Sequence, residues 1–117
     1  ASIDFYRRRR APELTPVQLL DGIASDKYRL AAEYGRQFYM DVPNTSVVAC
    51  QVLAENGDVD LCMNWDGSLA RFLCTSESLA SDESCFIGPD SGRAYLWVFG
   101  QITTIDFTVE CNIGSVN

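Results

Sequence analysis

The sequence predicts an all-β fold, an antiparallel β-sandwich or jelly roll with a short irregular or helical segment at its N-terminus. Residues 58–65 and 102–111 alternate between apolar and polar side chains, as strands with one buried face do. The turn dipeptides Asn-Gly at 56–57 and Asp-Gly at 66–67 bound the first of these runs. Several short strands punctuated by such turns are typical of sandwiches.

Length and composition fit one globular domain. The chain has 117 residues, of which 47% are apolar and 21% charged. We expect an N-terminal arm over residues 1–18, which holds an arginine run at 7–10, and a single sandwich domain over residues 19–117. No stretch approaches the roughly 18 apolar residues that a membrane-spanning helix needs, so we expect no membrane span.

The expected elements follow the turn signals along the chain. Thr15 as N-cap and Pro16 as the first helical residue favour a short helix that ends at the Asp-Gly pair at 21–22. Residues 26–34 also favour a helix by propensity. A turn at 43–44, a polar loop at 76–84 and a turn cluster at 88–92 then separate predicted strands at 37–42, 46–54, 58–65, 70–75, 85–87, 93–99 and 102–111.

The charge of the chain argues against nucleic acid as a partner. Sixteen acidic and nine basic residues give a net charge of −7. Four of the basic residues are the arginines at 7–10, so the remainder of the chain is more acidic still and repels phosphate backbones. We interpret the arginine run as a solvated tail or a proprotein-processing site, or alternatively as a docking site for an acidic partner.

Five cysteines in so short a chain indicate an oxidising compartment, and therefore a secreted, extracellular protein. Cys50 and Cys111 each lie on the predicted inner face of a strand, so they are a candidate disulfide pair. The odd number leaves at least one sulfur either as a thiol or bonded to another chain. The chain has no histidine, which excludes Ser-His-Asp and Cys-His catalysis, and we expect no enzyme.

Four side chains around one predicted strand have the chemistry of a calcium site. Asn56, Asp58, Asp60 and Asp66 fall within eleven residues of one another. Calcium takes about six to eight oxygen ligands, which carboxylates and turn carbonyls supply. The alternative is that these residues cap turns and solvate a sheet edge. Calcium is the one cofactor that the sequence suggests.

An aromatic stripe on the strand at 93–99 is a candidate binding surface. Tyr95, Trp97 and Phe99 alternate with Leu96 and Val98. If the two aliphatic residues face the core, the aromatic residues form an outer patch that suits an extracellular protein or a glycan. The alternative is that the N-terminal segment covers this patch.

A series of short motifs carries a resemblance to a known family. In chain order these are the strand and turn at 38–43, the Gly-Asp-Val-Asp-Leu run at 57–61, Cys74, the Glu-Ser-Cys run at 83–85, the Tyr-Leu-Trp-Val-Phe-Gly run at 95–100 and the Phe-Thr-Val run at 107–109. With these motifs, residues 19–110 resemble the bacterial pre-peptidase C-terminal domain. The resemblance implies a β-sandwich with an accessory role beside extracellular enzymes.

The resemblance has two local consequences. It implies an early strand and loop at 26–34 in place of the helix that propensity favours, and it implies that Cys74 pairs with Cys85. The sequence departs from the family at Cys62, where an aromatic residue is usual. With both pairs formed, Cys62 is either an inert, half-buried thiol or the site of an intermolecular disulfide that joins this chain to another.

These observations together predict a secreted, non-catalytic module for binding, targeting or assembly. The alternative is a small cysteine-containing effector or toxin that is released from a secreted precursor. Asn44 begins an Asn-Thr-Ser sequon on a predicted surface turn, so it is a candidate glycosylation site in a eukaryotic secretory protein.

Overall fold

The computed structural model describes residues 16–31, 34–68, 71–76, 82–100 and 104–115. The arginine run at 7–10 and Thr15 lie outside these residues. All regular structure in the described part is β, so the predicted fold class is confirmed, and no helix there is long and apolar enough to cross a membrane. The strands are β1 (Val17–Gln18), β2 (Tyr28–Leu30), β3 (Gly35–Ala54), β4 (Val59–Asn64), β5 (Cys74–Ser76), β6 (Asp82–Gly100) and β7 (Ile105–Ser115).

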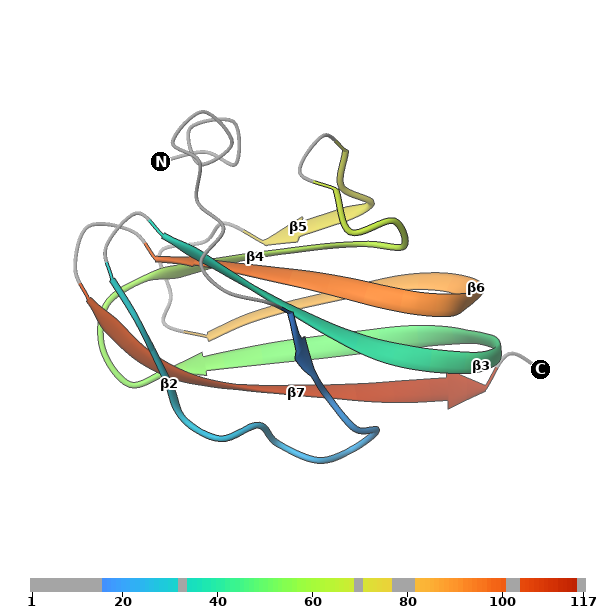
Figure 1. The fold of residues 1–117 in the computed structure, drawn as a ribbon, viewed down its shortest axis with the longest axis horizontal. Coiled ribbons are helices and arrows are strands. Elements are labelled where there is room, and N and C mark those ends of the chain that lie inside the picture. Colours follow the sequence, from blue (N-terminus) through green and yellow to red (C-terminus); the bar gives the residue numbers. More distant parts are fainter. Residues whose placement is uncertain (1–15, 32–33, 69–70, 77–81, 101–103, 116–117) are drawn as a thin grey trace.

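Two long strands, β3 and β6, take part in both layers of the sandwich. Their pairing is antiparallel throughout, but residues 35–42 of β3 face 92–99 of β6, whereas 46–53 face 82–90. Figure 1 shows both strands doubling back at the same end of the molecule. The strand order is β2-β7-β3-β6-β4-β5, with β1 added to β3 in parallel.

We name the two layers by their strands. The first layer contains β1, β4, β5 and the halves of β3 and β6 at 35–42 and 92–99. The second layer contains β2, β7 and the other halves of β3 and β6, because 46–54 of β3 also pairs with β7. The two layers are therefore continuous through the bends of β3 and β6.

The turns predicted at 43–44 and 88–92 are wrong, because both segments lie inside continuous strands. The β3–β6 register shifts on either side of Ser46, which is a bulge that bends the strands without ending them. Gly88 (φ 112°) and Gly92 (φ 120°) adopt backbone conformations that side chains rarely permit. A Cβ at Gly88 would lie 2.6 Å from the carbonyl oxygen of Ser46, so glycine lets the two bends pack together.

Both predicted N-terminal helices are also wrong. Val17 and Gln18 form β1 and lie opposite Phe38 and Tyr39 of β3, so the end of the predicted arm joins the first layer. Within 26–34 the structure has β2, which pairs with 105–107 of β7. The strand and loop implied by the family resemblance are thus correct there, because pairing with a sheet edge outweighs weak local helix propensity.

The core lies between the layers and contains the inward residues of each strand. Phe38 and Phe107 come from different layers, and both are fully buried. Their rings meet edge to face, with centroids 6.0 Å apart, and Tyr28 packs edge to face on Phe38 at 5.4 Å. Aromatic pairs of this geometry stabilise beyond their buried area, so this cluster fixes the two layers against each other.

A loop closes the outer edge of β7. The amide of Gly22 donates to the carbonyl of Cys111 at 2.8 Å, and the amide of Ser25 donates to that of Val109 at 2.7 Å. The hydroxyl of Ser25 in turn accepts a hydrogen bond from the Val109 amide. The loop at 19–26 is therefore fixed along the edge of β7 in the second layer.

Candidate binding groove

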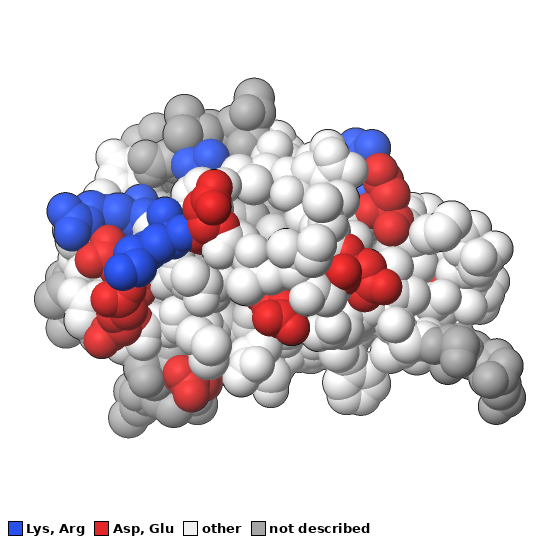
Figure 2. Space-filling view, turned by 90° about the horizontal axis from the view of Figure 1, so that it is seen from below, with Lys and Arg blue, Asp and Glu red and all other residues white. Residues whose placement is uncertain are grey.

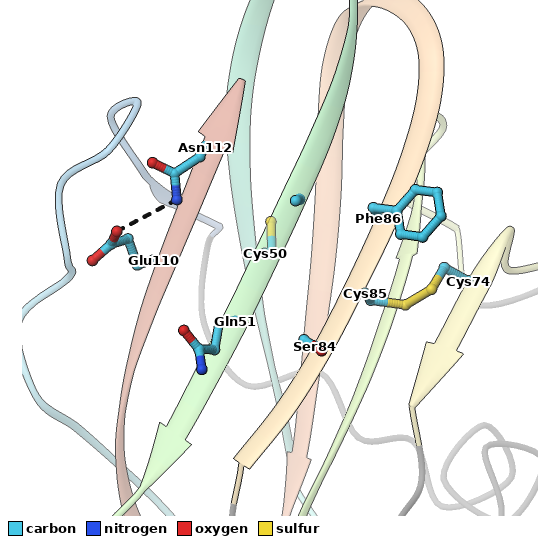
Figure 3. A pocket seen from close by; sticks show the side chains of 9 residues that line it. Cys50, Gln51, Cys74, Ser84, Cys85, Phe86, Glu110 and Asn112 are labelled. Atoms are coloured by element: carbon cyan, nitrogen blue, oxygen red, sulfur yellow. Dashed lines mark hydrogen bonds between the residues drawn. A yellow bond between two sulfur atoms is a disulfide. The ribbon is translucent and has the colours of Figure 1, made fainter. Parts of the chain in front are cut away.

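A shallow groove lies on the outer face of the second layer. It is formed across β7, β3 and β6 and has a volume of about 520 Å³. Cys50, Cys74 and Cys85 also border it. The side chains that line its open surface, drawn in Figure 3, are Ala49, Gln51, Ser84, Phe86, Glu110 and Asn112.

The register of the three strands explains the shape of the groove. Asn112, Ala49 and Phe86 lie opposite one another in one row across the sheet. The next row contains Glu110, Gln51 and Ser84. Adjacent strands are spaced by about 4.8 Å, so the Asn112 and Phe86 backbones are about 10 Å apart, with the small Ala49 side chain between them. Small residues in the floor and larger ones beside them produce the depression.

Phe86 is the exposed aromatic residue of this face. Its side chain is 66% exposed, although its neighbours Cys85 and Ile87 point into the core. The alternation of a strand therefore forces the ring outward. Sequence reasoning missed this residue because 85–87 looked like a brief strand beside a turn; the alternation of Cys85 and Ile87 with Phe86 was the available signal.

The aromatic patch predicted on β6 is wrong. Trp97 is 5% exposed and Phe99 is fully buried; their rings stack with centroids 5.9 Å apart. Tyr95 is half-buried, and its ring lies against the loop after β4, 3.2 Å from the position of a Cβ at Gly67. This part of β6 is central in the first layer, between β3 and β4, and both of its faces are covered.

The four predicted calcium ligands do not converge. Asn56 binds backbone, accepting from the amide of Asp106 at 3.1 Å, at one end of β4. Asp66 lies beyond the other end, about 17 Å away along a six-residue strand, and accepts from the amide of Ser68. That hydrogen bond lowers the pKa of Asp66, as expected for a residue that caps a turn. Because Asn56 and Asp66 lie at opposite ends of β4, the four residues do not form the predicted single calcium site. Within the described ranges, no three His, Cys, Asp or Glu side chains gather for a metal.

The two remaining calcium candidates have different surroundings. Asp60 is fully buried on β4. Asp58 lies just before β4 and close to Glu83 of β6, a carboxylate that is itself buried and bound by the hydroxyl of Ser76. Burial and the charge of Glu83 raise the pKa of Asp58 above its ordinary value, and Asp58 Oδ1 has no hydrogen-bond donor among the described residues.

The raised pKa of Asp58 predicts a pH-dependent gain from its removal. As pH rises through the ordinary aspartate pKa, Asp58 loses its proton in the unfolded chain but keeps it in the folded protein. The free energy of unfolding therefore falls until the pH passes the higher pKa of the folded state. We expect Asp58→Asn to raise the free energy of unfolding at pH 7 by about 0.5 kcal/mol, the scale of partly exposed charges. Thermal melts at pH 7 and pH 3 measure this, and an equal gain at both pH values would contradict it.

The structure contains both predicted cysteine pairs at bonding distance. Cys50 of β3 is joined to Cys111 of β7, and Cys74 of β5 is joined to Cys85 of β6, which links the first layer to the second. Cys62 is fully buried on β4, with its sulfur 4.0 Å from the carbonyl oxygen of Trp97. A bond to another chain needs an accessible sulfur, so this structure favours the inert thiol over the intermolecular disulfide.

The sequon asparagine is accessible. Asn44 is exposed in the irregular part of β3, where its carbonyl accepts a hydrogen bond from the Ser46 hydroxyl. It lies in a strand rather than in the predicted turn. Glycosylation of Asn44 stays a prediction.

Three of the five basic side chains in the described part pair with carboxylates. Lys27 pairs with Glu55, and Arg29 pairs with Asp106 at 2.9 Å. The guanidinium of Arg29 lowers the pKa of Asp106. Figure 2 shows most of the visible lysine and arginine side chains at one end of a face and a further basic group near the other end, with acidic side chains beside both groups and across the middle. The basic charge there is largely neutralised locally.

No protein-family model matches this chain, and its sequence matches no curated protein. Its fold does match solved structures. One is the pre-peptidase C-terminal domain of a collagenase from Bacillus anthracis, with a TM-score of 0.70 and 10% identity over 84% of this chain and 95% of that chain. Another is PliG from Aeromonas hydrophila, a periplasmic inhibitor of g-type lysozyme, with a TM-score of 0.68 and 9% identity over 88% of this chain and 99% of that chain.

A second lysozyme inhibitor has a similar fold. PliG from Salmonella Typhimurium matches with a TM-score of 0.52 and 11% identity, over 84% of this chain and 97% of that chain. These identities are too low to carry function, but the similarity in fold is extensive. The chain therefore has the β-sandwich fold of the pre-peptidase C-terminal domain, divergent in sequence, as its motifs indicated.

Proposed function

We propose that this chain is a secreted, non-catalytic module that binds another extracellular protein through the groove on β7, β3 and β6. The observation that carries the proposal is the exposure of Phe86 within the groove. Large aromatic side chains are costly to leave in water, and they are the residues that dominate the binding energy of protein interfaces.

The surroundings of Phe86 support a docking surface. Leu53, which lies on the same face of β3, is 45% exposed, so apolar surface extends along the second layer. The other lining residues are small or hydrogen-bonding: Ala49, Gln51, Ser84 and Asn112. Because the backbone of all three strands is fixed in a sheet, such a surface is preorganised, and ordering it on binding costs little.

The compartment and the fold are consistent with this proposal. Two disulfides are typical of proteins outside the reducing cytosol. Of the structures with a similar fold, one is described as the pre-peptidase C-terminal domain of a collagenase, and two are described as periplasmic lysozyme inhibitors. A lysozyme inhibitor is the second candidate function, favoured because the sandwich of this chain matches 99% of one such inhibitor.

The first test measures binding to purified g-type lysozyme by surface plasmon resonance, together with inhibition of its hydrolysis of bacterial cell walls. If the groove is the docking site, Phe86→Ala weakens binding at least tenfold, or about 1.4 kcal/mol. Leu73→Ala is the matched control, because Leu73 is a 54% exposed apolar residue outside the groove. If the two substitutions weaken binding equally, the groove is not the docking site. If the wild-type chain does not bind g-type lysozyme, this chain is not an inhibitor of that lysozyme.

The broader proposal has a test that assumes no partner. The photo-crosslinking residue p-benzoylphenylalanine is placed at position 86 in one variant and at position 73 in the other, in the organism that produces the chain. A discrete protein adduct at position 86 that is absent at position 73 supports binding through the groove. The same adducts at both positions, or none at position 86, would contradict it.

A further inference from the structure

We infer that the groove receives a cationic side chain, arginine or lysine, from a protruding loop of the partner protein. This inference rests on the proposed function and specifies the chemistry of the partner. It is carried by the charge of Glu110, the ring of Phe86 and the apolar loop that flanks Asn112.

Glu110 is the charged residue that lines the groove. Its Oε2 accepts a long hydrogen bond, 3.4 Å, from the side-chain amide of Asn112, so the two side chains lie together on β7 (Figure 3). A carboxylate offers about four lone-pair positions on two oxygens, so one long bond leaves most of its acceptor capacity available. A guanidinium or ammonium group satisfies such an acceptor with short, charge-assisted hydrogen bonds.

Four of the five cationic side chains in the described part of the chain are engaged elsewhere. Within the described residues, Lys27 and Arg29 pair with Glu55 and Asp106, and Arg93 pairs with Asp41. Arg36 lies over the ring of Tyr28, 5.1 Å from its centroid. The net charge of the whole chain is −7, so the potential around the groove attracts a cation and repels an anion.

The walls of the groove suit the other parts of such a side chain. Phe86 presents an exposed ring on the far side of Ala49 from Asn112. A cation over an aromatic face gains about 0.5–1 kcal/mol at an exposed site, and the methylene groups of arginine or lysine pack on apolar surface. The volume of about 520 Å³ exceeds one side chain, so the tip of a loop fits with it.

The flank of the groove favours a protein over a glycan. Gly22, in the loop along β7, lies beside Asn112: a Cβ there would be 3.4 Å from Asn112 Oδ1. The same loop carries Leu20 and Ile23, which are 58% and 57% exposed. Exposed aliphatic side chains next to an acidic groove suit apolar residues that neighbour the cationic residue in a partner loop, whereas a neutral sugar gains nothing from the negative potential.

The test is an NMR titration of the full ¹⁵N-labelled chain with N-acetyl-arginine N-methylamide, and with the citrulline analogue, which has nearly the same shape but no charge. We expect saturable shifts of the amide signals of Ser84, Phe86 and Glu110, with at least fivefold tighter binding of the arginine compound. Glu110→Gln should abolish the difference between the two compounds. Asp66→Asn, which removes an exposed carboxylate outside the groove, should leave it unchanged.

Three results would overturn the inference. Equal binding of the arginine and citrulline compounds would show that the groove does not recognise the positive charge. An unchanged preference for the arginine compound in Glu110→Gln would show that Glu110 is not the residue that recognises it. Shifts in the groove produced by neutral chitotriose but not by the arginine compound would assign the groove to a glycan. These failures differ from failure of the proposed function, which is decided by the effect of Phe86→Ala and by the crosslinks at position 86.

Discussion

Removal of the bond between Cys50 and Cys111, by the double substitution Cys50→Ala/Cys111→Ala, is expected to lower the free energy of unfolding by about 4 kcal/mol. The two residues are 61 positions apart in sequence, and in the chain-entropy model a closed loop of that length restricts the unfolded chain by this amount. Small domains are stable by about 5–15 kcal/mol, so the variant loses a large part of its stability. Urea denaturation at neutral pH measures the loss.

The second disulfide supplies the comparison. Cys74 and Cys85 are only 11 positions apart, so Cys74→Ala/Cys85→Ala should cost about 3 kcal/mol in the same model. The order of the two losses is the test. If the short loop costs as much as the long one, stabilisation arises from the native contacts of the sulfur atoms rather than from the restricted unfolded chain.

The other large effect is expected from Phe38→Ala, which should destabilise the protein by about 3–5 kcal/mol. Phe38 is fully buried and contacts the rings of Tyr28 and Phe107, which come from β2 and β7 of the second layer. Its truncation removes apolar surface and leaves a cavity where the two layers meet. Thermal and urea unfolding of the variant measure the change.

Phe86→Ala is the matched control for this substitution, because it makes the same chemical change at a side chain that is 66% exposed. We expect it to change the free energy of unfolding by less than about 0.5 kcal/mol. Similar losses for the two variants would mean that Phe86 is packed against protein. Its proposed role as an exposed docking residue would then be untenable.

Local sequence patterns predicted the strands but not how they continue. The alternation within β4 and β7 was sufficient to find both, although both faces of β4 are buried and only β7 has a partly exposed outer face. Pro43, Asn44 and the glycines at 88 and 92 are turn-forming residues by their backbone preferences. Whether such residues end a strand or bend it depends on the partner strand that continues alongside, and that information is not local.

The candidate groove could not be predicted from the sequence, for a related reason. Its residues come from three strands, at positions 49–51, 84–86 and 110–112, and only the register of β3 with β6 and β7 brings them together. Period-two alternation also does not reveal whether the second face of a strand is covered. This is why Trp97 and Phe99 were expected at the surface and are buried. Phe86 lies in the half of β6 that belongs to the second layer, and its ring is exposed.

The sharing of β3 and β6 between the layers has a consequence for how the molecule opens. In a sandwich made of two separate sheets, the sheets can separate from each other while the backbone pairing within each sheet stays intact. Here β3 and β6 run through both layers, so the layers cannot separate unless the bends at Ser46 and Gly88 are also disrupted. Opening of one layer is thus coupled to loss of the other, which favours all-or-none unfolding over partly opened forms that would expose the interior to proteases.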